Sequence, residues 1–292
     1  MRLRFPAVVA ATLALLLGTG TAALAAPPAS SSSSGPTYYL ALGDSLAQGV
    51  QPNSSGVSAP TNHGYVDDLY AVYRRQVPGL QLVKLGCPGE TTQTMRSGVC
   101  PYSGHNQLAA AVNFLTAHRG HIFVVTLDIG ANNVTGCVSA TGVTDCRDRI
   151  NAAGADLKEI LKTLRGAYPG PIVGMNYYDP YLAAWRQVTA GPAIARASVR
   201  LTNAFNSVLE SAYTTSVKPS VPVADVSAAF FTNTFTMLPV VNLPLNVATI
   251  CLLTWMCAPV PVGPNIHPRS LGYLVIAGAF LKVGLPRTGS PG

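Results

Sequence analysis

The sequence predicts an α/β fold: a three-layer α/β/α sandwich around a five-stranded parallel sheet. Short runs of apolar and β-branched residues recur along the chain, and between them lie longer segments whose apolar residues repeat at the spacing of one helix face. Strands separated by helices pair in parallel through right-handed crossovers. At 292 residues, 48% of them hydrophobic, the chain is long enough for one substantial core. We expect a single domain over residues 37–285.

Five segments are expected to form the strands, in chain order TYYLALGD (37–44), LQLVKLGC (80–87), HIFVVTLDIG (121–130), PIVGMNYYD (171–179) and VPVADV (221–226). The intervening helices are expected to begin near Gly64, Asn106, Arg147 and Ala197, and a last one near Ser270. The expected strand order is the flavodoxin-like order 2-1-3-4-5, in which the first three strands lie side by side.

The carboxyl ends of the first three strands carry polar and glycine-rich turns. The first strand ends in Gly43-Asp44-Ser45, the second continues into GCPGETT (86–92), and the third continues into DIGANN (128–133). Ligands of open parallel sheets bind outside these ends, where the strand order reverses. The sequence therefore places a hydroxyl, a glycine-rich turn and an asparagine amide at one crevice.

The N-terminal residues have the features of a signal peptide. Two arginines precede an apolar run, and small residues at Ala23 and Ala25 suit a signal peptidase. A membrane anchor is the alternative, but the apolar run is short and an A-x-A site follows it directly. We expect a signal peptide over 1–25, a Pro/Ser-rich leader over 26–36 and a C-terminal tail over 286–292. The protein is thus expected to be secreted and extracellular.

Six cysteines are expected to form three disulfides, because thiols of an exported protein pair in an oxidising compartment. Nearest-neighbour pairing is the simplest choice, since each pair then falls within one expected loop: Cys87-Cys100, Cys137-Cys146 and Cys251-Cys257. A metal site is the rival interpretation, but no C-x-x-C motif occurs. We expect no metal and no cofactor.

The net charge of +7 raises the question of a nucleic-acid partner. The basic residues are scattered rather than clustered, and no nucleic-acid motif accompanies them. The charge is therefore interpreted as a contribution to solubility, with mild attraction to anionic surfaces, and no nucleic-acid partner is expected. We expect a monomer.

Ser45 needs a base before its hydroxyl becomes a nucleophile. Four of the five histidines are assigned to capping, surface or solvated-turn roles: His63, His105, His118 and His121. His267 differs, because Pro268 favours an extended backbone there and a helix follows shortly. Its loop leads out of the fifth strand and should emerge at the same edge of the sheet as Ser45. A structural His-Pro turn is the alternative.

Four motifs, GDSLAQG, GCPGETT, GANN and NIHP, resemble the ordered blocks of the SGNH (GDSL) hydrolases, in particular secreted actinobacterial esterases and lipases. The resemblance covers nearly the whole mature chain. It implies that Ser45 is the nucleophile and His267 the general base. It further implies an oxyanion hole formed by the backbone N–H groups of Ser45 and Gly89 and the side-chain amide of Asn132. Such donors are worth about 3 to 4 kcal/mol each. Simple turn roles for Gly89 and Asn132 are the alternative.

The chain departs from the family pattern at the third catalytic member. The family usually has Asp three residues before the histidine, whereas this chain has Pro264 there and Asn265 next. A backbone carbonyl can also fix the imidazole tautomer, because it only accepts hydrogen bonds. We therefore expect a Ser45–His267 dyad oriented by a carbonyl of Pro264 or Asn265. Asp225, at the end of the fifth strand, is a candidate substitute acid, although a structural role is favoured.

A long uncharged segment precedes His267. No Asp, Glu, Lys or Arg lies between Asp225 and Arg269, and the stretch 228–262 is rich in Phe, Leu and Met. Such a segment suits an acyl-chain groove, and whether it is a mobile lid is left open. A buried insertion is the equally favoured alternative.

The expected function is that of a secreted serine esterase or lipase, phospholipase included. It would act through an acyl-enzyme on small-molecule or lipid esters, with transient lipid-surface contact. The alternatives are a non-catalytic binding protein on the same fold, because the acid is missing, and a carbohydrate deacetylase, against which the apolar segment argues.

Overall fold

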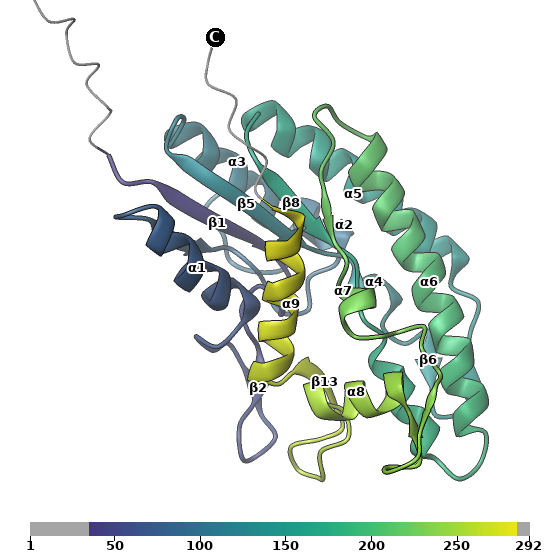
Figure 1. Ribbon diagram of the computed structural model, residues 1–292. Coiled ribbons are helices and arrows are strands. Elements are labelled where there is room, and N and C mark those ends of the chain that lie inside the picture. Colours follow the sequence, from purple (N-terminus) through teal and green to yellow (C-terminus); the bar gives the residue numbers. More distant parts are fainter. Residues whose placement is uncertain (1–34, 285–292) are drawn as a thin grey trace, which may run out of the picture. The chain divides into compact units, whose positions relative to one another are not determined.

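The computed structural model describes residues 35–284. The expected signal peptide, nearly all of the leader and the expected tail lie outside the described residues. The chain between these ends forms a parallel sheet in the order β4-β1-β5-β8-β9, covered on both faces by helices (Figure 1). This confirms the predicted three-layer class and the predicted strand order. The sheet strands are β1 (Tyr38–Gly43), β4 (Gln81–Lys84), β5 (Ile122–Asp128), β8 (Ile172–Met175) and β9 (Val223–Ala224).

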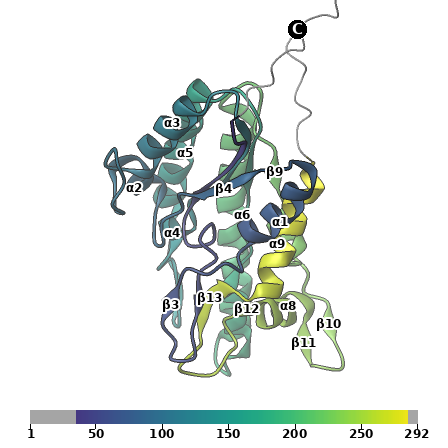
Figure 2. The same ribbon diagram turned by 90° about the vertical axis from the view of Figure 1, so that its left-hand side faces the viewer.

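Nine α-helices and one 3₁₀-helix surround the sheet within residues 35–284. The views in Figures 1 and 2 show α1 and α9 over one face and α3, α5 and α6 over the other. The helices are α1 (Tyr65–Gln76), α2 (Thr92–Ser97), α3 (Gln107–Ala117), α4 (Ala131–Val134), α5 (Arg147–Ala167), the 3₁₀-helix (Pro180–Arg186), α6 (Gly191–Thr215), α7 (Val226–Ala229), α8 (Leu245–Leu253) and α9 (Ser270–Val283). Among them, no helix has the length and apolar composition to cross a bilayer.

Short antiparallel pairs extend from the sheet. They are β2 (Gln51–Pro52) with β3 (Ser58–Ala59), β6 (Val138–Ser139) with β7 (Gly142–Val143), β10 (Met237–Leu238) with β11 (Leu243–Pro244), and β12 (Thr254–Trp255) with β13 (Asn265–Pro268). The last pair carries His267.

The middle of the sheet forms the core because its strands are apolar on both faces. Residues 39–42 of β1 have no exposed surface, and β5 and β8 are similarly buried. On the outer layer, α5 and α6 approach closely at Gly154, where a Cβ atom would come within 2.3 Å of the Val208 side chain. A larger residue at 154 would therefore force the two helices apart.

Helix α6 begins at Gly191, six residues earlier than the sequence predicts. The pair Gly191-Pro192 resembles a turn in sequence, but proline is compatible with the first turn of a helix, where its missing N–H would have no partner. The earlier start matters because α6 supplies one wall of the pocket described below.

Three disulfides join Cys87 to Cys100, Cys137 to Cys146 and Cys251 to Cys257, the nearest-neighbour pairs expected from the sequence. The first secures the loop after β4, the second lies at the start of α5, and the third ties α8 to the loop that leads to β13.

The uncharged segment 228–262 packs against the body of the protein. Phe230, Val247 and Ile250 have no exposed surface, and Phe230 stacks on the Tyr178 ring at 4.5 Å between centroids. The segment thus follows the buried-insertion alternative for these side chains, while its hairpin β10–β11 projects outward.

Candidate active site

The turn after β1 brings Ser45 to the carboxyl edge of the sheet. Gly43 has φ +139°, and a Cβ atom there would lie 2.0 Å from the Asp128 carbonyl oxygen at the end of β5. Glycine is therefore required where the two strand ends meet. The Asp44 N–H then donates to that same carbonyl at 3.0 Å, which fixes the direction in which the chain turns into Ser45.

His267 meets Ser45 across 222 residues of sequence. Its Nε2 atom lies 3.0 Å from the Ser45 Oγ, a hydrogen-bond distance. The histidine is on β13, which pairs with β12 through Trp255 and Asn265. The Arg269 guanidinium lies 4.1 Å from the centroid of the Trp255 ring and stacks on it. The strand that carries the imidazole is thus held from both ends.

The side chain of Asn265 orients the imidazole. Its Oδ1 atom lies 2.8 Å from His267 Nδ1 and also accepts the His267 backbone N–H at 3.0 Å. Because a backbone N–H can only donate, this second contact fixes which end of the amide is the oxygen, and the Nδ2 group then donates to the Ser58 Oγ at 2.8 Å. Nδ1 must then carry the proton, and Nε2 is left free to accept one.

This arrangement corrects the expectation of a backbone carbonyl. The acceptor is the side-chain oxygen of Asn265, and the Pro264 carbonyl makes no bond to the ring. A side chain two residues from the histidine reaches Nδ1 because β13 is extended, so residues 265 and 267 point to the same side of the strand.

The Asp225 carboxylate is remote from the imidazole. It caps α7 by accepting the Ala228 N–H at 3.0 Å, and it accepts the Asn176 side-chain amide at 2.8 Å. Asp225 is therefore structural, as the favoured interpretation of the sequence had it, and it is not a substitute acid.

The three expected oxyanion donors lie at adjoining strand ends. Within residues 35–284, the backbone N–H groups of Ser45 and Gly89 donate no hydrogen bond. Gly89 has φ +84°, a conformation that favours glycine. Asn132, in α4, lines the same pocket as Ser45, and its Nδ2 donates to the Glu90 carbonyl at 2.9 Å, which leaves its second N–H for another partner.

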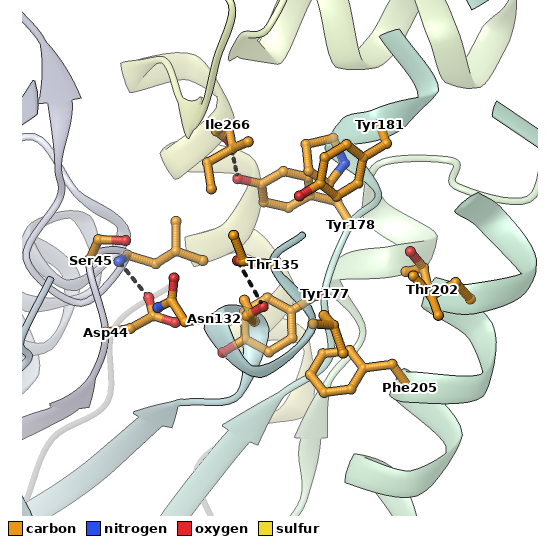
Figure 3. Close-up of a pocket in the computed structure, with 15 residues that line it drawn as sticks. Asp44, Ser45, Asn132, Thr135, Tyr177, Tyr178, Tyr181, Thr202, Phe205 and Ile266 are labelled. Atoms are coloured by element: carbon orange, nitrogen blue, oxygen red, sulfur yellow. Dashed lines mark hydrogen bonds between the residues drawn. The ribbon is translucent and has the colours of Figure 1, made fainter. Parts of the chain in front are cut away.

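A pocket opens beside Ser45 (Figure 3). The space between its walls, open mouth included, is about 680 Å³. Its walls come from the turn after β1, from α4, from the chain after β8, from α6 and from β13; the apolar and aromatic lining includes Leu46, Val134, Tyr177, Tyr178, Tyr181, Leu201, Phe205 and Ile266.

No residue of the segment 228–262 lines this pocket. The wall is formed instead by the tyrosines of 177–181 and by α6. The signal that could have found it is the aromatic run YYDPY directly after the fourth strand, at the carboxyl edge of the sheet. The Tyr178 hydroxyl donates to the Ile266 carbonyl at 2.7 Å, which ties this wall to the strand that carries His267.

Burial sets the protonation of the groups around the serine. It lowers the pKa of His267 to about 4, so the imidazole is neutral at pH 7. Burial also raises the pKa of Asp44 to about 6 and that of Glu90 to about 7. The pKa of Asp128 is raised by its burial and then by the nearby Asp44. The imidazole is therefore in the protonation state that can accept a proton from the Ser45 hydroxyl.

The remaining histidines lie away from the pocket. His118 packs against Tyr38 and Phe114. His63 and His105 lie in loops, and His121 precedes β5. Across residues 35–284, no three His, Cys, Asp or Glu side chains are grouped so as to hold a metal ion.

A three-layer parallel fold, with a serine ending the first strand and a histidine ahead of the last helix, defines an SGNH-type hydrolase. The chain belongs to the GDSL-like lipase/acylhydrolase family, whose sequence profile matches residues 41–274. No curated protein matches it in sequence.

Two solved structures illustrate the shared fold. An acetylxylan esterase from Geobacillus stearothermophilus is 18% identical, with 87% of this chain and 97% of that one covered and a TM-score of 0.52. The extracellular lipase from Streptomyces rimosus is also 18% identical, with 83% and 99% covered and a TM-score of 0.53. At these identities the likeness establishes the fold.

Proposed function

We propose that this protein is a secreted serine esterase or lipase that hydrolyses carboxylic esters through an acyl-enzyme. The family supports acyl-ester hydrolysis in general. The observation that carries the specific proposal is the 3.0 Å contact between the Ser45 Oγ and the His267 Nε2, together with the backbone N–H groups of Ser45 and Gly89, which donate to no acceptor within residues 35–284. A hydroxyl, a neutral base and free donors at one crevice are the parts that acyl transfer needs.

In the proposed reaction, Nε2 of His267 takes the hydroxyl proton while the Ser45 Oγ attacks the ester carbonyl carbon. The carbonyl oxygen becomes an oxyanion, which accepts from Ser45 N–H, Gly89 N–H and the free Asn132 N–H. Collapse expels the alcohol, which receives the proton from the imidazolium. Water then attacks the acyl-enzyme with the same imidazole as base, and the acid leaves.

Asn265 performs one of the two duties of the usual aspartate. It holds the imidazole in the tautomer with the proton on Nδ1, through the 2.8 Å contact of its Oδ1. An amide has no charge, so it stabilises the imidazolium through a dipole only. The site therefore resembles a serine-histidine-asparagine triad more than a dyad, and the pKa of His267 stays low because no anion opposes the effect of burial.

The pocket walls suit an apolar acyl group. Leu201 and Phe205 on one side and Ile266 on the other offer hydrocarbon and aromatic surface beside Ser45. We therefore expect p-nitrophenyl esters of medium-length acids to be better substrates than the acetate, and the substrate to be a small-molecule or lipid ester. A signal peptide over 1–25, secretion and a monomeric state are part of the proposal.

A fluorophosphonate probe tests the proposal. The full chain should acquire one adduct per molecule on Ser45, and Ser45→Ala should acquire none. A folded wild-type protein that is neither labelled nor active on esters would instead be a binding protein on this fold. A panel of acyl esters and acetylated oligosaccharides then separates an esterase from a carbohydrate deacetylase, since the latter would act on the sugar acetates alone.

A further inference from the structure

Two segments distant in the sequence contain no charged side chain. Residues 49–63 and 226–268 have no Asp, Glu, Lys or Arg. The first forms the hairpin β2–β3, and the second includes the hairpin β10–β11, α8 and the loop between β12 and β13. The surface of a small soluble domain usually carries roughly a quarter to a third of charged residues. Two uncharged segments with exposed loops are therefore unusual.

The tips of these segments expose aliphatic side chains to solvent. Seven of the twelve large apolar side chains that are exposed among residues 35–284 belong to the two segments. We call five of them the apolar rim, and their exposed fractions are 97% for Val240, 80% for Val260, 62% for Leu252, 60% for Val57 and 52% for Val241.

Two of the loops that carry the apolar rim adjoin each other and the reactive pair. A Cβ atom on Gly56 would come within 2.0 Å of the Pro261 carbonyl oxygen, so the tip of one hairpin rests on the loop between β12 and β13. Ser58, next to Val57, bonds to Asn265, which in turn bonds to His267. Figures 1 and 2 both show β2–β3, this loop and β10–β11 at the end of the molecule toward which the sheet strands point.

We infer that the apolar rim docks reversibly on an electrically neutral lipid surface and thereby presents ester groups to Ser45. This inference rests on the proposed function. Protruding aliphatic side chains enter the headgroup region and gain free energy as their methyl groups leave water. Neither segment has an Asp, Glu, Lys or Arg, so no carboxylate, ammonium or guanidinium group has to be dehydrated on contact. An ester-bearing surface is the partner that matches an uncharged rim continuous with an ester-cleaving site.

Vesicle flotation tests the inference without turnover. Full-length Ser45→Ala protein should float with phosphatidylcholine vesicles. Adding Val240→Asp together with Val260→Asp should weaken this partitioning by about tenfold or more, since each change removes apolar contact and adds a charge. Val99→Asp is the matched control: Val99 is 61% exposed but follows α2, well away from the rim loops in Figure 2. It should leave partitioning unchanged.

Activity measurements with the native serine complete the test. The double variant should hydrolyse a dissolved short-chain p-nitrophenyl ester at the wild-type rate, which also shows that it is folded, yet lose most of its activity on emulsified esters. Equal partitioning of the double variant and the parent would overturn the inference. So would binding confined to anionic vesicles and abolished by salt, or sedimentation that shows the rim to be buried between two copies of the chain. Each of these results leaves labelling of Ser45 intact, so the proposed function would stand.

Discussion

Replacing Asn265 by alanine is the most direct test of how the imidazole is oriented. The change removes the Oδ1 atom that lies 2.8 Å from His267 Nδ1 and 3.0 Å from its backbone N–H. It leaves the Ser45 contact geometrically available, because Nε2 is on the other side of the ring. The expected defect is thus in the chemical step rather than in substrate binding.

The magnitude follows from the hydrogen bond that is lost. In the transition state the ring is an imidazolium, and a hydrogen bond to a charged group is worth about 1.5 to 3 kcal/mol. At about 1.4 kcal/mol per factor of ten, kcat should fall by roughly 10- to 150-fold, while KM should change little.

Steady-state kinetics on a soluble p-nitrophenyl ester, followed across pH, provides the assay. A kcat for Asn265→Ala within threefold of wild type would refute the role assigned to the Asn265 side chain. It would favour the earlier expectation that a backbone carbonyl orients the imidazole. Asn265→Asp is the informative partner, because a carboxylate accepts the same two bonds and adds a charge. It should retain activity and move the acidic limb of kcat/KM to higher pH, since an anion raises the pKa of the histidine. In the wild type that limb should lie near pH 4, where the imidazole becomes protonated and can no longer act as a base.

Three further outcomes are expected. Ser58→Ala removes the acceptor of the Asn265 Nδ2 group and lets the amide rotate, so kcat should fall several-fold with KM unchanged. Ser58→Thr keeps a hydroxyl and should have the wild-type kcat, and Ser54→Ala, in the same hairpin, should have no effect. Leu201→Trp fills the pocket beside Ser45, so acyl preference should move toward acetate, and an unchanged chain-length profile would place the acyl group elsewhere. Burial raises the pKa of Asp179 to about 7. Because a raised pKa in the folded state gives stability that is lost as pH rises through it, Asp179 should contribute about 1 kcal/mol to the fall in the free energy of unfolding in urea between pH 6.5 and 8, and Asp179→Asn should lessen that fall.

The sheet could be predicted because its strands are buried on both faces and therefore appear as continuous apolar runs bounded by turns. The proximity of Ser45 and Asn132 could also be predicted. They follow the first and third strands, which are neighbours in the sheet once the strand order is known. The position of His267 followed from the loop that leaves the fifth strand. These placements follow from the topology of the sheet, which the order of strands and helices along the sequence predicts.

The details that were missed depend on side-chain direction. Ser58 carries no motif, and it reaches Asn265 across 207 residues only because the hairpin β2–β3 folds back onto β13. Hydrophobicity alone could not show that Phe230 and Val247 face inward while Val240 faces water. The sequence pattern therefore pointed to the more apolar segment, whereas the pocket beside Ser45 is lined by the tyrosines after β8.

The stacking of Arg269 on Trp255 provides a natural optical reporter. The chain has two tryptophans, and Trp255 pairs directly with Asn265 in the short ladder that carries His267. A cation held against an indole alters its emission, so any displacement of this ladder should change fluorescence intensity or colour. With Trp185→Phe as background, a single emitter would follow inhibitor capture or adsorption to an emulsion in real time, without an attached dye.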